Sequence, residues 1–241
     1  MQSRFRWVLA GIGFVAGVYL VAAMPQAAET RRPNPHLPGI DFVAQHSSNM
    51  IEEGRQTFRY DTFGDEAFWG GTLRLHEAIE GAALGGVGPG VSPKTALDVG
   101  LKVDVDALSP QVRNAIAKGR VNLDDPRTTI ELLRQNAVVG VTGVVGSDSH
   151  LQTMGIQCAF CHSTVDNSFA PGIGHRLDGW ANRDLNVGAI VALAPNLQPF
   201  ADLLGTDVET VKRVLLSWGP GKFDAELILD GKAFQPDGRS S

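Results

Sequence analysis

The segment CAFCH, residues 158 to 162, holds both cysteines of this 241-residue chain, and a histidine directly follows the second. A disulfide between Cys158 and Cys161 would close a loop too short to restrain much of the unfolded chain. A zinc site needs four ligands, and no second cysteine pair is present to complete the set. A thioredoxin-like redox pair needs only the thiols and leaves His162 unexplained.

Covalent haem attachment accounts for all three residues of this segment. In C-x-x-C-H the two thiols add to the haem vinyl groups, and the short turn between them directs the next histidine at the iron. The sequence therefore predicts one haem c per chain, anchored by Cys158 and Cys161, with His162 as the proximal iron ligand. A redox pair or a partial metal site is the alternative.

The ligand on the other side of the iron is less clearly marked. Small electron-carrying cytochromes usually place a methionine there, downstream of the attachment site. This chain has no methionine after Met154, which is more typical of a filler of apolar space. The remaining histidines are His36, His46, His76, His150 and His175.

Two of these histidines are candidates for the distal position. His175 lies thirteen residues after His162, which is far enough for the chain to pass around the haem edge. His76 shares a predicted helix face with Trp69 and Leu73, where a core histidine with a satisfied hydrogen bond is the alternative interpretation.

The run CAFCHSTVDNSFAPGIGHRLDGW resembles the N-terminal haem domain of bacterial di-haem cytochrome c peroxidases, in which C-x-x-C-H is followed at a similar interval by a GIGH-like segment. The resemblance implies that His175 is a displaceable distal ligand. Two further segments, residues 58–79 and 217–238, look like the leading half of larger peroxidase-like cytochromes. The sequence contains no second C-x-x-C-H, so we expect a truncated di-haem protein or a separate protein that supplies the second haem.

Other residues near the motif are candidates for holding the haem. Arg176, Arg183 and Trp180 are hypothetical partners of the haem propionates, with surface arginines and a core tryptophan as the alternative interpretation. A carbonyl of Pro171 or Gly172 is a candidate acceptor for the second ring nitrogen of His162.

The N-terminus predicts export. Arg4 and Arg6 precede an uncharged apolar run over residues 7–23, and small residues suited to cleavage follow. Residues 1–28 are accordingly interpreted as an export signal or an uncleaved membrane anchor, and residues 29–45 as a proline-rich linker. We expect residues 46–241, a mono-haem cytochrome c-like domain, to be periplasmic or anchored on the periplasmic face of the inner membrane.

Composition fits an ordinary globular domain. Hydrophobic residues make up 43% of the chain, charged residues 20%, and the formal net charge is -5. An acidic surface argues against nucleic acid as a partner. The expected partner is a redox protein, which includes the case of a second haem protein, and the membrane is contacted only through an uncleaved N-terminal segment.

The periodicity of apolar residues predicts helices and no convincing strands. Ser47 or Ser48, Asp65, Asp125 and Thr206 are the expected N-caps, and Pro110 is expected in the first turn of a further helix. The fold class expected is all-α, a cytochrome c-like helical domain with long loops around the haem. The helices are predicted over residues 49–58, 66–79, 108–119, 124–140 and 206–220.

Two classes of function follow from these expectations. The first is electron transfer outside the cytoplasm by a bis-histidine haem, whose potential is low because no methionine ligates the iron. The second is peroxidase-like reduction of hydrogen peroxide, which needs an acid-base group such as Asp166 or Asp178. Gas sensing needs only a weak or absent distal ligand and has no specific support in the sequence.

Overall fold

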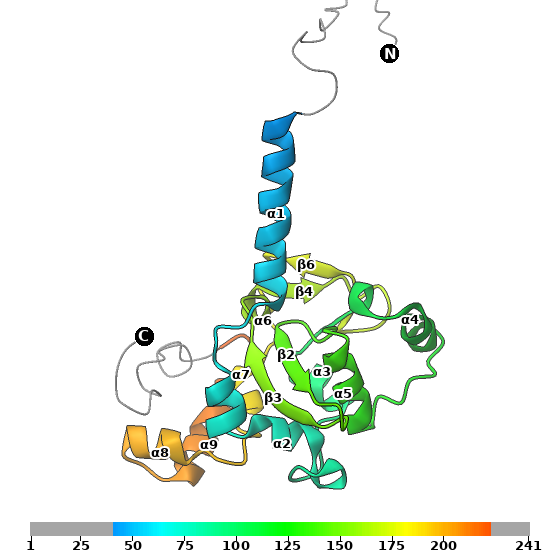
Figure 1. The fold of residues 1–241 in the computed structure, drawn as a ribbon. Helices are drawn as coiled ribbons and strands as arrows, with labels where there is room; N and C mark the ends of the chain where they lie inside the picture. The colour runs from blue at the N-terminus through cyan, green and yellow to red at the C-terminus, as the bar shows by residue number, and fades with distance from the viewer. Residues whose placement is uncertain (1–40, 223–241) are drawn as a thin grey trace, which may run out of the picture. The chain divides into compact units, whose positions relative to one another are not determined.

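The computed structural model describes residues 41–222, and from Val43 onward these residues belong to one compact unit (Figure 1). The predicted export segment and most of the predicted linker lie outside the described residues. Within residues 41–222, no helix is long and apolar enough to cross a membrane.

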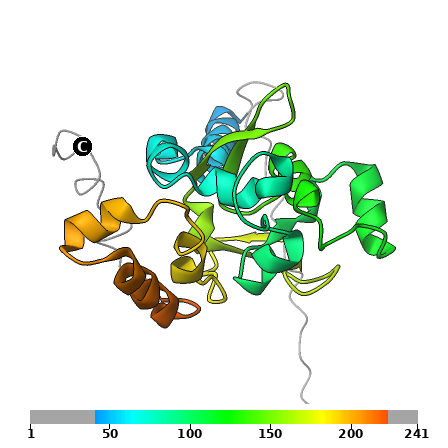
Figure 2. The same cartoon turned by 90° about the horizontal axis from the view of Figure 1, so that it is seen from below.

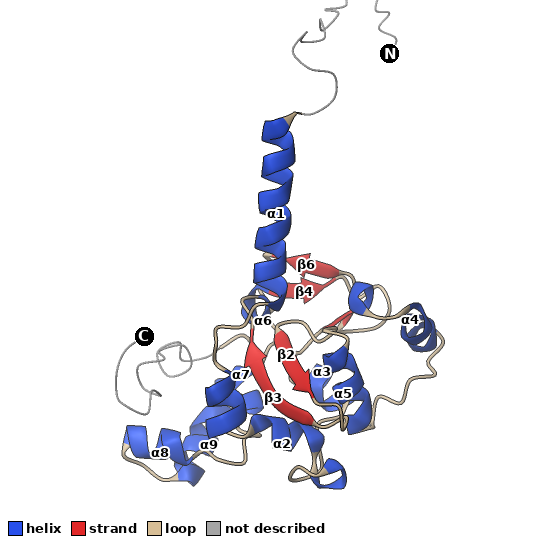
Figure 3. Ribbon diagram, viewed as in Figure 1, coloured by secondary structure: helices blue, strands red, loops and turns tan. Residues whose placement is uncertain are grey.

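Helices account for most of the regular structure in the described range (Figure 3). Several helices begin with a capping side chain that accepts a hydrogen bond from the backbone of the first turn. These N-caps are Ser92, Ser109, Asp125, Asn186 and Asp207. The α-helices are α1 (Phe42–Tyr60), α2 (Leu75–Glu80), α3 (Pro93–Asp98), α4 (Pro110–Ala117), α5 (Pro126–Arg134), α6 (Ala159–His162), α7 (Val187–Val191), α8 (Gln198–Leu204) and α9 (Val208–Trp218). Shorter or wider helical turns are η1 (Ala67–Thr72), η2 (Ala82–Leu84) and η3 (Val105–Ala107).

The expectation of an all-α fold is wrong, because the described residues also form three two-stranded sheets. β2 and β3 pair antiparallel, as do β4 and β6, whereas β1 and β5 pair parallel. The strands are β1 (Val103–Asp104), β2 (Val141–Val145), β3 (Leu151–Ile156), β4 (Ser163–Val165), β5 (Ile173–Gly174) and β6 (Arg176–Asp178).

The sequence pattern did not predict these strands because of how they are buried and how short most of them are. α5 packs against β2, while η1 and α2 pack against β3, so the longest hairpin is covered by helices on both strands. The buried positions of β3 therefore run consecutively at Met154, Gly155 and Ile156 instead of alternating. The strands outside this hairpin are two or three residues long, which is too short to show a period of two.

Several helix boundaries also differ from those expected. α1 begins at Phe42, ahead of the serines expected to cap it. The single helix expected over residues 66–79 is broken into η1 and α2, because Arg74 between them adopts a left-handed conformation with φ of 58°. Asp207 caps α9 in place of Thr206. The predicted Asp125 cap and the position of Pro110 in the first turn of α4 are confirmed.

The hydrophobic core lies around the β2–β3 hairpin and extends to the C-terminal helices. Leu133, Val141, Leu151 and Phe200 are each buried in it. Figure 2 shows α8 and α9 beside each other, and α9 also contacts α7. The core thus joins the hairpin that precedes the CAFCH segment to the elements that follow it.

Gly140 sets how closely the hairpin approaches the CAFCH turn. It has a φ of +84°, and a Cβ atom added to it would lie 2.1 Å from the Cα atom of Phe160. The carbonyl of Gly140 also accepts a hydrogen bond from Gln157 N at 3.1 Å. Only glycine satisfies both the left-handed backbone and this backbone-to-backbone contact.

We expect Gly140→Ala to destabilise the protein by about 2–5 kcal/mol, since backbone strain and overpacking against Phe160 add together. Urea denaturation measures the change in free energy of unfolding. Gly119→Ala is the matched control, because Gly119 has a φ of +62° with no atom within 4 Å of the added Cβ. It should cost only about 1–2 kcal/mol. Equal losses in the two variants would contradict the role assigned to the contact with Phe160.

Candidate functional site

The CAFCH segment forms a single helical turn with two different faces. Cys158 is the N-cap of α6, and Ala159 and Phe160 are buried at 0% and 5% exposure. Cys158, Cys161 and His162 have helical spacings of three and four residues, so they share the other face. Both cysteines are half-buried and His162 is exposed, so the reactive groups face outward from the core.

Backbone hydrogen bonds hold this turn at both ends. Before it, Thr62 forms a bridge with Gln157, and the Gln157 side chain donates to Thr142 Oγ1 at 2.7 Å. After it, the carbonyl of Cys161 accepts from Asn182 N at 3.0 Å, and that of His162 accepts from Gly179 N at 2.8 Å. The orientation of the turn is therefore fixed by the folded chain.

The two thiols are free, and burial raises the pKa of the Cys161 thiol. A raised pKa leaves less thiolate at neutral pH, which is the opposite of an activated redox cysteine. In residues 41–222, no group of three or more His, Cys, Asp or Glu side chains is arranged to hold a metal ion. The redox-pair and zinc interpretations of the motif thus gain no support from the geometry.

The His162 ring makes no hydrogen bond with any described residue. Of the two carbonyls expected to orient it, those of Pro171 and Gly172, the Gly172 carbonyl accepts a hydrogen bond from Val103 N at 2.9 Å. The imidazole therefore has both nitrogens available on the outward face of the turn.

His175 is half exposed, and its ring is oriented by a carboxylate from a distant segment. Its Nδ1 atom lies 2.9 and 3.0 Å from the two carboxylate oxygens of Asp106, which belongs to η3. This hydrogen bond and the charge of Asp106 raise the pKa of His175. A carboxylate on one imidazole nitrogen is the arrangement that commonly orients a metal-ligating histidine and leaves the other nitrogen free.

The β4–β6 hairpin fixes how His162 and His175 are related. His162 O pairs with Gly179 N at one end of the hairpin, and His175 O pairs with Asp166 N at the other. The two histidines are therefore about 13 Å apart along the hairpin, because four residues of strand each span about 3.3 Å. The structure places them in one hairpin but not side by side.

Arg176 lies inside the protein beside this hairpin. Its side chain is 2% exposed, and Nε lies 3.1 Å from Oδ2 of the equally buried Asp104. The guanidinium carbon is 5.9 Å from the centre of the Tyr60 ring. None of its nitrogens has hydrogen-bond geometry toward a described atom, and burial lowers its pKa. Its buried position and its pairing with Asp104 identify Arg176 as a residue that ties β6 to β1.

Trp180 and Arg183 are on the surface. Trp180 is 66% exposed and follows Gly179, whose amide holds the His162 carbonyl. Phe63 is 61% exposed, and its amide donates to Ile156 O just before the motif. The exposure of Trp180 excludes its interpretation as a core residue. Trp180 and Phe63 thus place one exposed aromatic ring in each of the segments that hold the two ends of the CAFCH turn.

Two carboxylates considered as acid-base groups are already engaged. Asp178 accepts hydrogen bonds from Arg59 at 2.7 Å and from Ser163 at 2.9 Å. Asp166 accepts from Ser168 Oγ and from His175 N, and these hydrogen bonds lower its pKa. His76, the other distal candidate, is half-buried on α2 with its Nδ1 atom buried and without a partner among the described residues.

Sequence reasoning missed Asp106 and Arg59. Asp106 is 69 residues from His175 and Arg59 is 119 residues from Asp178. Neither residue belongs to a local sequence motif, so no local pattern marks it as a partner of the hairpin. Comparison of the chain with protein-family models, curated proteins and solved structures finds no match.

We expect Arg176→Met to lower the free energy of unfolding by about 3–5 kcal/mol, because the buried Asp104 carboxylate then lacks its counter-charge. Chemical denaturation at neutral pH measures the loss. Arg127→Met is the control, since Arg127 is 74% exposed and its ion pair with Asp125 is worth about 1 kcal/mol or less. A loss as small as that of the control would contradict the assignment of Arg176 to the interior.

Proposed function

We propose that this protein is a c-type cytochrome that binds one covalent haem and transfers electrons outside the cytoplasm. The observation that carries the proposal is the geometry of α6. Its buried face holds Ala159 and Phe160, so both thiols and the His162 ring are presented together on the other face. The three groups that the motif requires for thioether attachment and iron ligation are thus directed to the same side.

The donor set fits such a haem. Cys158 and Cys161 are free thiols for the two thioether bonds, and His162 has an unpartnered ring for the proximal position. The haem supplies the one-electron chemistry, while the chain holds it and orients its ligands. The resemblance to the N-terminal haem domain of di-haem peroxidases supports the same assignment.

His175 is our candidate for the distal ligand. Asp106 binds Nδ1, and Nε2 forms no hydrogen bond with the described residues. The carboxylate also raises ring basicity, which strengthens an imidazole as a ligand. Two imidazole ligands imply a lower potential than a histidine–methionine pair.

Peroxidase-like chemistry is the alternative, and it rests on the resemblance alone. The carboxylates considered for proton transfer, Asp166 and Asp178, are both committed to hydrogen bonds within the fold. Electron transfer requires no such group, and for that reason we favour it.

Intact-mass measurement of the protein, produced with a c-type haem maturation system, tests the proposal directly. We expect a mass increase of one haem that survives denaturation, because thioether bonds are covalent. Replacing both Cys158 and Cys161 with serine should remove it. Full-length protein that is folded, matured under conditions that load another c-type cytochrome, and still without haem would refute the proposal.

Optical and EPR spectra of His175→Ala test the distal ligand. We expect the six-coordinate low-spin signal of the wild-type haem protein to become high-spin, since the iron loses one imidazole. His150→Ala is a matched control, because His150 is equally exposed and its Nδ1 atom also contacts a carboxylate, that of Glu80. A low-spin spectrum in both variants would remove His175 from the iron and make His76 the next residue to replace.

A further inference from the structure

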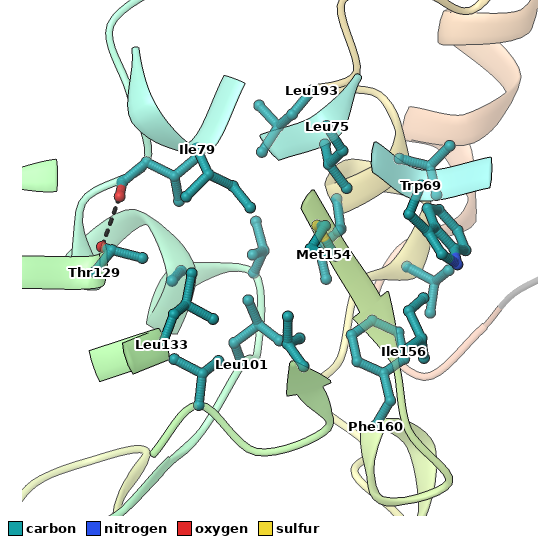
Figure 4. Close-up of a pocket in the computed structure, with 18 residues that line it drawn as sticks. Trp69, Leu75, Ile79, Leu101, Thr129, Leu133, Met154, Ile156, Phe160 and Leu193 are labelled. Carbon is teal, nitrogen blue, oxygen red and sulfur yellow. Dashed lines mark hydrogen bonds between the residues drawn. The ribbon is translucent and has the colours of Figure 1, made fainter. Parts of the chain in front are cut away.

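The core contains an apolar cavity with a volume of about 50 Å³. Figure 4 shows the lining side chains, with Ile79, Thr129 and Leu133 on the left and Trp69, Ile156 and Phe160 on the right. The residues that line it come from most of the elements between η1 and α7. They are Trp69, Leu75, Ile79, Leu101, Leu133 and Phe160 among others, with Thr129 as the one side chain that carries a hydroxyl.

The side chains that line the cavity are mostly buried. Every lining side chain is buried except those of Ile79, Val99, Leu101 and Leu193. Of these four, Leu193 is the most exposed, at 39%, and the others are half-buried. Leu193 is therefore the lining side chain most accessible from solvent.

The polar groups of the lining side chains are occupied, which keeps water out. Thr129 Oγ1 donates to Val91 O at 2.6 Å, and Trp69 Nε1 donates to Asp65 Oδ2 at 2.7 Å. A buried water needs two to four polar partners. Because the side chains offer none, the cavity is expected to be dry.

The volume selects the size of the occupant. A void needs only about 10–15 Å³ to hold a water-sized molecule, whereas an apolar cavity of about 150 Å³ takes a molecule as large as benzene. The volume of about 50 Å³ lies between these values. It admits a diatomic molecule and is far below the roughly 300 Å³ at which pockets for larger organic ligands begin.

We propose that this cavity binds one small apolar molecule of the size of a diatomic gas, such as dioxygen or nitric oxide. Phe160 lines the cavity and is one of the two residues between Cys158 and Cys161. A gas molecule held there lies one aromatic side chain from the turn that carries both thiols. The relevance of this position to a haem rests on the proposed function, whereas the binding of gas does not.

Xenon is the probe, because it is apolar, inert and detected by NMR. The full-length protein, labelled at its methyl groups, is titrated with xenon under pressure. We expect saturable chemical-shift changes at the methyl groups of Ile79, Leu133 and Met154, since all three line the cavity. In the same titration with dioxygen, the signals of these lining methyl groups should broaden before those of other methyl groups, because dioxygen is paramagnetic.

Leu101→Phe fills the space from a half-buried position and should abolish the saturable shifts. Leu203→Phe is the matched control, because Leu203 is 47% exposed on α8 and does not line the cavity. If Leu101→Phe does not fold, Val99→Ile adds a single methylene at the rim and should weaken the xenon-induced shifts. Leu133→Ala enlarges the void and should extend binding to benzene.

The absence of saturable shifts in the wild-type protein would overturn the proposal, as would shifts that persist in Leu101→Phe. The titration is repeated on the variant in which serine replaces both cysteines. Xenon shifts that are the same with and without the cysteines support the gas site independently of haem. Failure of haem attachment together with normal xenon binding would refute only the proposed function.

Discussion

The close contact between Gly140 and the backbone of Phe160 is the constraint on which the presentation of the CAFCH turn depends. It lets the strand pair β2–β3 approach α6 without an intervening side chain. Ala159 and Phe160 can then be buried, which leaves Cys158, Cys161 and His162 facing away from the core. A helical turn of four residues has little stability of its own. Its orientation is set by the hairpin and by the hydrogen bonds that hold its two ends.

Phe160 has a second consequence because its ring also forms part of a cavity wall. A void of about 50 Å³ lowers stability by about 1 kcal/mol at about 24 cal/mol per Å³. One larger residue at the rim would fill the space, so the cavity is not imposed by the fold. The packing of Phe160 therefore affects both features. Its ring forms part of the cavity wall, and its burial leaves the two thiols on the opposite face of α6.

Charged groups hold the region on the other side of the turn. Arg59 from the last turn of α1 binds Asp178, while Arg176 and Asp104 form a buried pair between β6 and β1. Asp106 lies two residues after Asp104 and orients His175. One short segment, residues 104–106, thus both anchors β6 and positions the candidate distal histidine. Movement of η3 would change the stability of the hairpin and the orientation of His175 together.

The sequence by itself determined the chemistry of the motif and several local features. C-x-x-C-H specifies thiols and imidazole at fixed spacing, and Asp125 and Pro110 mark helix starts, because these signals depend only on neighbouring residues. The sheets and the partners of Arg176 and His175 were decided by the tertiary structure. The buried residues of β3 run consecutively and the strands outside the hairpin are two or three residues long, so neither shows alternation, and Asp104 and Asp106 meet Arg176 and His175 from about 70 positions away. Such contacts arise only when the folded chain brings distant segments together, so no local pattern in the sequence records them.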